Sequence, residues 1–332
     1  MSEFPFSNRT DWSLENNPLS SALESLRSEG CEILDLTESN PTGCGFVYPS
    51  GWLVALSNQN NLTYAPEDKG MLVARQAIAK YYKSRNLKVD PQDIVLTSGT
   101  SEGYSFLLKL LTNPNDHVLI PKPSYPLFQF LLELHDVRFD YYPLLHDGSW
   151  RIDRAAFKAL VRDNTKAVIL VNPNNPTGSY ISAEDIDFLN EECVKARMAI
   201  ISDEVFYDYQ LNDQIVPKSL ACNEKVLTFV LSGISKILGL PQMKLSWITV
   251  NGPNVVKEGA LQRLEIIADT YLSVNTPVQN ALSQWLCDAR QIQVQIILRV
   301  QKNLEFLHQK GLNFLAVDGG WYAVIKSPSI TY

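Results

Sequence analysis

The sequence predicts an α/β protein, with a three-layer α/β/α large domain around a mostly parallel sheet and a small, partial second domain. Short apolar runs rich in Val, Ile and Leu recur along the chain, as strands buried on both faces of a parallel sheet do. Longer stretches with helical spacing separate these runs. Such alternation is the pattern of layered α/β domains.

Six apolar runs are expected to be strands, and they share a length of four to six residues. They lie at 94–97, 117–120, 167–171, 199–202, 227–231 and 245–250. Helices are expected at 71–86, 101–111, 125–135, 182–197 and 275–286. Ser182, followed by Glu184 and Asp185, is a helix N-cap with acidic residues in the first turn.

A further, long helix is expected at 288–310, where an apolar stripe recurs from Ile292 to Leu307. At 332 residues the chain exceeds a typical single domain. We expect residues 1–45 to contribute to the small domain and 46–287 to form the large one. Residues 288–332 would then supply the linking helix and an incomplete C-terminal part of the small domain.

Composition narrows the classes of function. A net charge of -7 and a pI near 5.2 argue against nucleic-acid and membrane-surface partners. The five cysteines are scattered without a C-x-x-C pair, and the four histidines include no ligand-like i, i+4 pair, so no metal site is expected. With no apolar stretch of signal-peptide or membrane-span length, we expect a cytoplasmic protein.

Polar candidates directly follow four of the predicted strands, the place where open α/β sheets bind ligands. Ser98, Gly99 and Thr100 stand at a helix N-terminus, where free backbone N–H groups favour an anion such as phosphate. An ordinary strand-to-helix turn explains them as well. The turn at 172–178, with two Asn-Pro steps, is rigid enough to direct the amide of Asn175 into a pocket, although a purely structural turn is the alternative.

The other two candidates carry charge. Asp203 ends a buried strand, and a desolvated carboxylate needs a cation or hydrogen-bond donors. A protonated heterocycle would supply the cation, while an N-cap role is equally consistent with the sequence. Ser235 and Lys236 lie between two apolar strands among small residues, whereas an isolated loop lysine is normally solvated.

Together these motifs resemble the aminotransferase class I and II family of pyridoxal-phosphate enzymes, the fold type I group. The resemblance runs from about Leu36 to Tyr322 and includes the Asn-Asn-Pro-Thr-Gly turn, the Ser-Asp-Glu strand end and the Ser-Lys site, in family order. It implies that the large domain binds pyridoxal 5'-phosphate. It also implies an enzyme of amino-acid metabolism that moves an amino group between an L-amino acid and a 2-oxo acid.

The resemblance assigns roles residue by residue. Lys236 resembles the lysine that carries the cofactor as an imine and moves the substrate's α-proton, and Asp203 the partner of the pyridinium nitrogen. Asn175 resembles the donor to the cofactor's phenolic oxygen. The resemblance assigns the phosphate-binding turn to Ser98, Gly99 and Thr100, and further phosphate contacts to Ser235 and Lys244. It assigns the aromatic that stacks on the ring to Tyr125. Tyr64 resembles the tyrosine that reaches the neighbouring subunit's phosphate, which implies a homodimer.

Three departures from the family pattern stand out. Phe206 occupies a position that is usually tyrosine, which leaves Asn175 alone to serve the phenolic oxygen, and Lys244 replaces a usual arginine as a point charge. Tyr207 is expected to point to the opposite face. The chain stops at Tyr332, before the part of the small domain that usually carries the arginine for the substrate carboxylate, and Lys326 is a weak candidate for that role.

Two alternatives stay open at this point. The chain is consistent with another enzyme of the same cofactor and fold, a C-S lyase or a synthase. It is also consistent with a non-catalytic, truncated homologue that binds the cofactor. The sequence does not reveal the amino donor or the acceptor.

Overall fold

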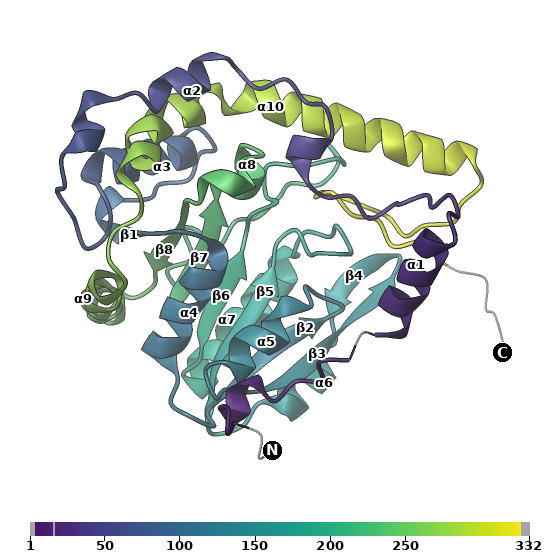
Figure 1. Ribbon diagram of the computed structural model, residues 1–332. Helices are drawn as coiled ribbons and strands as arrows, with labels where there is room; N and C mark the ends of the chain where they lie inside the picture. Colours follow the sequence, from purple (N-terminus) through teal and green to yellow (C-terminus); the bar gives the residue numbers. More distant parts are fainter. Residues whose placement is uncertain (1–3, 16, 327–332) are drawn as a thin grey trace.

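An eight-stranded sheet forms the centre of the computed structural model, which describes residues 4–15 and 17–326 (Figure 1). The strand order is β1-β8-β7-β6-β5-β2-β3-β4. The strands are β1 Ile94–Thr97, β2 His117–Lys122, β3 Arg138–Asp147, β4 Ser149–Ile152, β5 Thr165–Val171, β6 Ala199–Asp203, β7 Thr228–Gly233 and β8 Ser246–Asn251. Strands β7, β6, β5, β2 and β3 pair in parallel, whereas β8 and β4 run antiparallel to their neighbours.

Helices cover both faces of this sheet, which gives the three layers. The helices are α1 Pro18–Ser28, α2 Gly51–Ala55, α3 Leu72–Lys83, α4 Thr100–Leu111, α5 Leu127–Glu133, α6 Arg154–Leu160, α7 Ala183–Ala196, α8 Ile234–Ile237, α9 Asn254–Tyr271 and α10 Thr276–Gln309. One apolar core lies under α4, α5 and α9, and the other under α3, α6, α7 and α10.

The side chains of β5 show how the sheet divides the two cores. Ala167, Ile169 and Val171 belong to the core under α4, whereas Val168 and Leu170 belong to the core under α3 and α7. Alternate side chains of a strand point to opposite faces, so both sets must be apolar when both faces are covered. This confirms the α/β/α class predicted from the sequence.

All six predicted strands are present, and the sequence missed β3 and β4. Strand β3 lies near the edge of the sheet, has Tyr142 as its buried residue and contains Pro143, so it lacks the continuous apolar run of the central strands. Proline also weakens a strand assignment because it cannot donate to the ladder. These two strands therefore carry little sequence signal.

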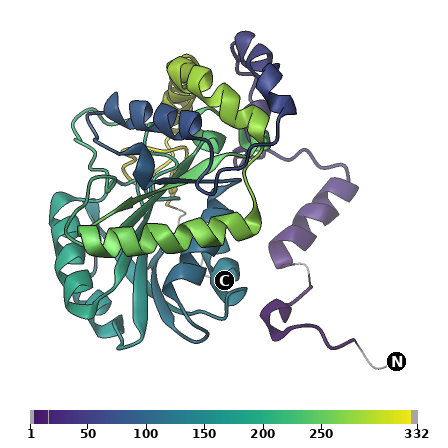
Figure 2. The same ribbon diagram turned by 90° about the vertical axis from the view of Figure 1, so that its left-hand side faces the viewer.

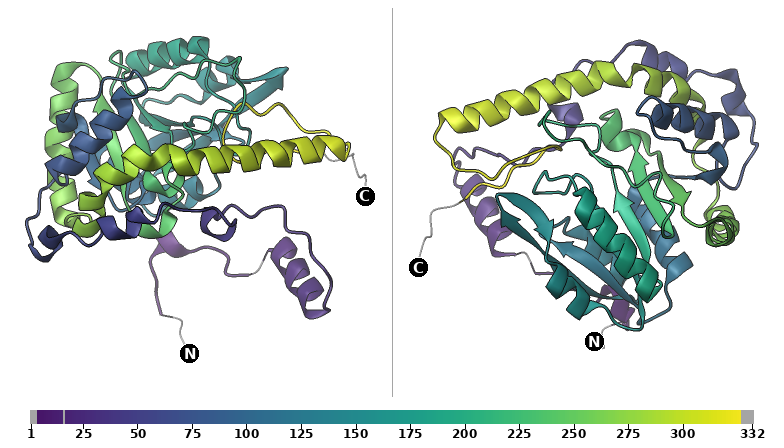
Figure 3. Two further views of the ribbon diagram at one scale, coloured as in Figure 1. Left: turned by 90° about the horizontal axis from the view of Figure 1, so that it is seen from above. Right: turned by 180° about the vertical axis from the view of Figure 1, so that it is seen from behind.

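The two helices predicted at 275–286 and 288–310 are wrong as separate elements, because α10 is continuous. Trp285 and Ala289 are both buried, four residues apart on one face, so packing continues across the expected break. Figure 3 shows α10 as one unbroken helix. Helix α9 was not predicted, since its buried face consists of Ala260, Leu264 and Ala268, two of them small. Helix α1 lies beside the layered body and has no buried residue (Figure 2).

The proposed division into residues 1–45, 46–287 and 288–332 stays a prediction. Within the described residues, no helix combines the length and the apolar character that a membrane crossing requires.

Two glycines that precede helices at the sheet edge give a matched test of packing. A methyl group on Gly233 would lie 2.2 Å from Oγ of Ser246 and 3.0 Å from the carbonyl oxygen of Leu245, whereas one on Gly99 would meet nothing within 4 Å. Both residues have extended φ values, 176° and -175°. We expect Gly233→Ala to lower the free energy of unfolding by about 2 to 4 kcal/mol, because the clash includes backbone.

In urea unfolding at neutral pH, Gly99→Ala should stay within about 0.5 kcal/mol of the natural protein. Equal destabilisation by the two substitutions would contradict a specific clash of a side chain at residue 233 with Ser246 and Leu245.

Candidate active site

Strand register brings the polar candidates to one edge of the sheet. Ser246 of β8 lies opposite both Thr97 and Gly233, so the residues after β1 and β7 share that edge. Asp203 at the end of β6 lies between Val171 and Leu231. The segments that begin with Ser98, Asn172, Asp203 and Ile234 therefore leave the sheet side by side.

Asp203 is a buried carboxylate without a paired cation. Its Oδ2 accepts a hydrogen bond from Oη of Tyr104 at 3.1 Å, and its Oδ1 accepts one from the backbone N–H of Val205 at 3.2 Å. Within the described part of the chain no cationic side chain lies close enough to form an ion pair with it. Burial raises the pKa of Asp203 from 3.8 to about 6, against the opposing effects of these two hydrogen bonds and of Lys236.

Lys236 lies in α8 with its amine in a largely desolvated position. Burial lowers the pKa of that amine, and the charge of Asp203 acts in the opposite direction. Its Nζ lies 5.1 Å from the centre of the Trp321 ring and 5.4 Å from that of Phe206. The backbone carbonyl of Lys236 accepts a hydrogen bond from Oη of Tyr209, which ties the short helix α8 to the loop after β6.

The separation of Lys236 and Asp203 matters for what fits between them. The two charges act on each other, yet among the described residues they form no ion pair. A buried acid that lacks a contacting cation fits a protonated heterocycle, whose nitrogen would supply the missing charge. The donor set therefore fits a pyridine-type cofactor that is attached to the amine.

Backbone donors at the start of α4 fit a phosphate. Gly99 precedes the helix without a side-chain cap, so the first N–H groups of this twelve-residue helix are free. The carboxylate of Glu102 accepts a hydrogen bond from the backbone N–H of Ser98 at 2.6 Å and thus orders the turn. The backbone N–H of Ile234 donates to the carbonyl of Leu245, which places Ser235 and Lys244 at the same edge.

Lys244 is exposed and forms no ion pair within the described residues, so its charge is available to an anion. It adopts a left-handed backbone conformation with φ of 53°.

In the turn after β5, the side chains of two asparagines form hydrogen bonds within the described chain, and that of the third does not. Asn172 donates to the carbonyl of Lys218 at 2.7 Å and accepts from the N–H of Ile181. Oδ1 of Asn174 accepts from the hydroxyl of Thr177. Asn175 is half-buried, and its side-chain amide makes no hydrogen bond to any described residue. Its donor is therefore free for a ligand.

The two candidate tyrosines differ in their surroundings. Tyr125 is 39% exposed, and its ring packs on Phe128, which also contacts Tyr104, the donor to Asp203. Burial and then the charge of Asp203 raise the pKa of Tyr125. Tyr64 is 77% exposed and makes no ring contact or hydrogen bond within the described chain. The structure thus brings Tyr125 to the site of this chain and leaves Tyr64 at the surface.

Sequence reasoning missed three residues at this site, Tyr104, Tyr209 and Trp321. Tyr104 lies on the buried face of α4 with Leu107 and Leu108, a spacing that signals a packed tyrosine whose hydroxyl needs a partner. Tyr209 carries no comparable signal. Trp321 follows two glycines, and a methyl group on Gly319 would lie 2.7 Å from Oη of Tyr180. Strand β6 ends at Asp203 and residues 205–208 form a turn, so strand alternation does not apply to Tyr207, whose hydroxyl donates to the carbonyl of Pro217.

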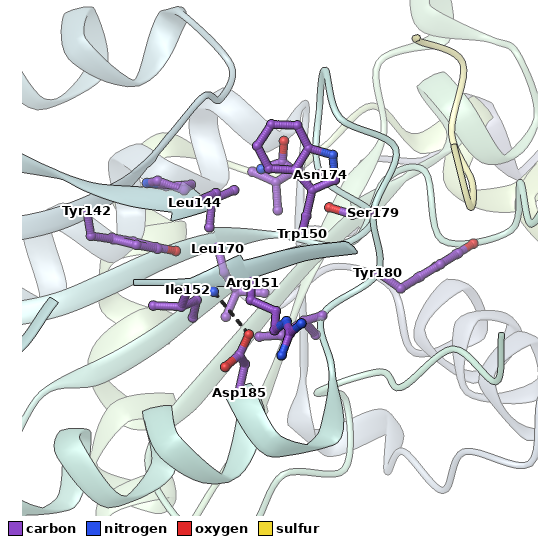
Figure 4. A pocket seen from close by; sticks show the side chains of 13 residues that line it. Tyr142, Leu144, Trp150, Arg151, Ile152, Leu170, Asn174, Ser179, Tyr180 and Asp185 are labelled. Carbon is purple, nitrogen blue, oxygen red and sulfur yellow. Dashed lines mark hydrogen bonds between the residues drawn. The ribbon is translucent and has the colours of Figure 1, made fainter. Parts of the chain in front are cut away.

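A separate small cavity lies under β4 beside the turn at 172–178 (Figure 4). Its volume is about 40 Å³, and its walls include Tyr142, Trp150 and Asn174. The backbone N–H of Ile152 donates to Asp185 at its wall. Such a space holds water but is too small for a heterocyclic cofactor.

The α/β/α sandwich around a mostly parallel sheet is the fold of the fold type I aminotransferases. The solved structures agree. An aminotransferase from Escherichia coli has a TM-score of 0.81 and 26% identity, with 96% of this chain and 82% of that chain covered. The alanine aminotransferase from Pyrococcus furiosus has a TM-score of 0.82 at 22% identity, with 95% and 82% covered, and shares the fold.

The sequence matches the family Aminotransferase class I and II over residues 32–326, and the chain belongs to this family. The glutamate-pyruvate aminotransferase AlaA of Haemophilus influenzae is 33% identical over 260 residues, which are 77% of this chain and 64% of that protein. The protein of the same name from Escherichia coli is 30% identical, with 80% and 66% covered. The chain therefore spans slightly less than two thirds of the length of these relatives.

The buried carboxylate makes the stability of the cofactor-free protein depend on pH. Because the folded pKa of Asp203 is raised above 3.8, its contribution is fully present below pH 3.8 and is lost as the pH rises through about 6. Between pH 4 and pH 7, Asp203→Asn should therefore gain roughly 3 kcal/mol in unfolding free energy relative to the natural protein.

Urea unfolding across this pH range measures the difference, with Asp213→Asn in an exposed loop as the control for the loss of one carboxylate. A pH-independent difference for Asp203→Asn would contradict a desolvated acid at this position.

Proposed function

We propose that the protein is a pyridoxal-phosphate-dependent aminotransferase that moves an amino group between an L-amino acid and a 2-oxo acid. The observation that carries the proposal is the buried carboxylate of Asp203, which accepts from Tyr104 and Val205 and acts on the amine of Lys236 without an ion pair between them among the described residues. Family membership and the names of the relatives support it.

The residues that would hold the cofactor follow from the site. Asp203 would pair with the ring nitrogen, with Tyr104 fixing the carboxylate, and Asn175 would donate to the phenolic oxygen. The turn of Ser98, Gly99 and Thr100, with Ser235 and Lys244, would bind the phosphate, and Tyr125 would stack on the ring. When bound, pyridoxal phosphate supplies an electron-accepting ring that stabilises negative charge on the substrate carbon.

Lys236 is suited to move a proton in such a site. A solvated lysine amine with an ordinary pKa of about 10.4 is protonated and therefore a poor base or nucleophile. Burial at this position disfavours the cation, so its nitrogen is neutral more of the time and can accept a proton. The centres of the aromatic rings of Phe206 and Trp321 lie 5.4 and 5.1 Å from that nitrogen, and the rings contribute to its burial.

Phe206 and the binding of the substrate carboxylate are two points at which the site differs from the family pattern. Phe206 is buried and has no hydroxyl, so Asn175 is the donor that we assign to the phenolic oxygen. The substrate carboxylate needs a cation or a set of donors. Lys326, the weak candidate from the sequence, is exposed, and its backbone N–H donates to the carbonyl of Asn313. We do not assign the carboxylate to it.

We also propose a cytoplasmic location and a homodimer. All five cysteines are free thiols, which suits a reducing compartment. Tyr64 and its neighbour Leu62 are both strongly exposed, as apolar side chains at a protein interface are. A tyrosine that contacts no partner among the described residues of its own chain is free to reach the phosphate of the neighbouring subunit.

The central test is the absorption of the protein mixed with pyridoxal phosphate. We expect a visible band that shifts when an amino donor is added, and Lys236→Ala should lose both the band and at least about 1000-fold of the donor turnover. Lys195→Ala, which removes an exposed lysine on α7, is the control. A band unaffected by Lys236→Ala would refute the assignment of this lysine.

Product analysis separates the remaining candidates. An aminotransferase yields one oxo acid per donor and transfers the amino group to an added 2-oxo acid. A lyase or synthase breaks this stoichiometry, and a non-catalytic binding protein shows the band without any donor-dependent shift.

Subunit mixing tests the role of Tyr64. Tyr64→Ala should weaken cofactor binding roughly 10- to 100-fold, the effect of losing one hydrogen bond to a charged group. When Tyr64→Ala and Lys236→Ala chains are mixed, each mixed dimer regains one complete site, so cofactor binding should return. Mixing that restores nothing, or a monomer in sedimentation, would contradict a shared site.

A further inference from the structure

Two aromatic rings from distant parts of the chain enclose the amine of Lys236. Phe206 follows β6, and Trp321 lies near the end of the described chain. The ring centres of these two residues are 5.2 Å apart and tilted by 69°, so they form one continuous wall. The amine lies within cation–π distance of both rings.

Backbone hydrogen bonds hold Trp321 against this site. The N–H of Gly319 donates to the carbonyl of Gly178 at 2.8 Å, and the N–H of Gly320 donates to the carbonyl of Tyr209 at 2.8 Å. The segment therefore joins the turn after β5 to the loop after β6. Gly319 must be glycine, because a methyl group would overlap the ring of Tyr180.

The ring of Trp321 also contacts the support of Lys236. Its centre lies 5.0 Å from that of Tyr209, whose hydroxyl donates to the carbonyl of Lys236. Trp321 thus packs against both the backbone anchor and the amine of the same residue. Its own Nε1 is buried and makes no hydrogen bond to a described residue, so packing holds this ring in place.

We propose that Trp321 is a positioning residue, which holds the side chain of Lys236 under its indole ring and stabilises the cationic form of the amine through the indole face. The inference rests on the proposed function, in which the Lys236 nitrogen is the reacting atom. Indole offers the strongest π face among the aromatic side chains, and the interaction is stronger where water is excluded.

The electrostatic surroundings make this contribution measurable. Among the described residues, Asp203 on β6 is the charged group that acts on the amine. The hydroxyl of Tyr209 is bonded to the Lys236 carbonyl, and that of Tyr48 to the carbonyl of Gly239. Tyr322 contacts Phe206 by its ring. Burial lowers the pKa of the Lys236 amine, and the indole, the Asp203 carboxylate and the Phe206 ring act together in the opposite direction.

The test titrates the Lys236 amine in the cofactor-free protein. The rate at which a small acylating reagent modifies Lys236 is measured against pH by mass spectrometry, and exposed Lys195 is the internal reference. We expect Trp321→Leu to lower the pKa of Lys236 by roughly 0.5 to 1.5 pH units, whereas Trp321→Phe should give a smaller fall, because benzene is a weaker π face. Trp12→Leu, which alters a remote ring on the N-terminal segment, should leave the value unchanged.

An unchanged or raised pKa of Lys236 in Trp321→Phe and Trp321→Leu would overturn the proposal. If Trp321→Leu fails to fold, Trp321→Phe decides by itself. Cofactor addition separates this inference from the proposed function: absence of the visible band in the natural protein refutes the function, whereas a band together with an unmoved amine titration refutes the role of Trp321.

Discussion

A carboxylate that is buried without a paired cation among the described residues is the constraint on which the site depends. Asp203 ends a central strand, where desolvation raises its pKa, while a phenol, one backbone N–H and the charge of Lys236 act in the opposite direction. Such a group is costly unless a cation joins it, so its presence points to a cationic ligand. Within the described chain the amine of Lys236 forms no ion pair with it, so that role remains for the ligand.

Glu204, the residue after Asp203, is a second buried acid at the same strand end. Glu204 is equally buried, but it accepts hydrogen bonds from Ser202, Ser219 and the backbone of Leu220. Burial raises its pKa to about 7, against the effect of those donors. Adjacent acids therefore have different environments: Glu204 accepts three hydrogen bonds from nearby residues of the chain, whereas Asp203 accepts one from the distant Tyr104 and one from the backbone of Val205.

Distant segments are tied together around Lys236. The segment at Gly319 to Trp321 bonds to the turn after β5 and to the loop after β6, and it places Trp321 beside Lys236. Tyr209 joins the same loop to the backbone of α8. A change in any of these contacts is therefore expected to reach Lys236, since the ring and the hydroxyl act on one residue.

Local sequence determined the central strands, about half of the described helices and the residues that leave the carboxyl ends of the strands, because apolar runs, helix caps and Asn-Pro turns act over a few neighbours. It marked Asp203 and Lys236 for the same reason. It could not show Tyr104 on Asp203, Tyr209 under Lys236 or Trp321 beside the amine, and it divided α10 in two. Those features depend on contacts between residues up to about a hundred positions apart, which only the packing of the layers decides.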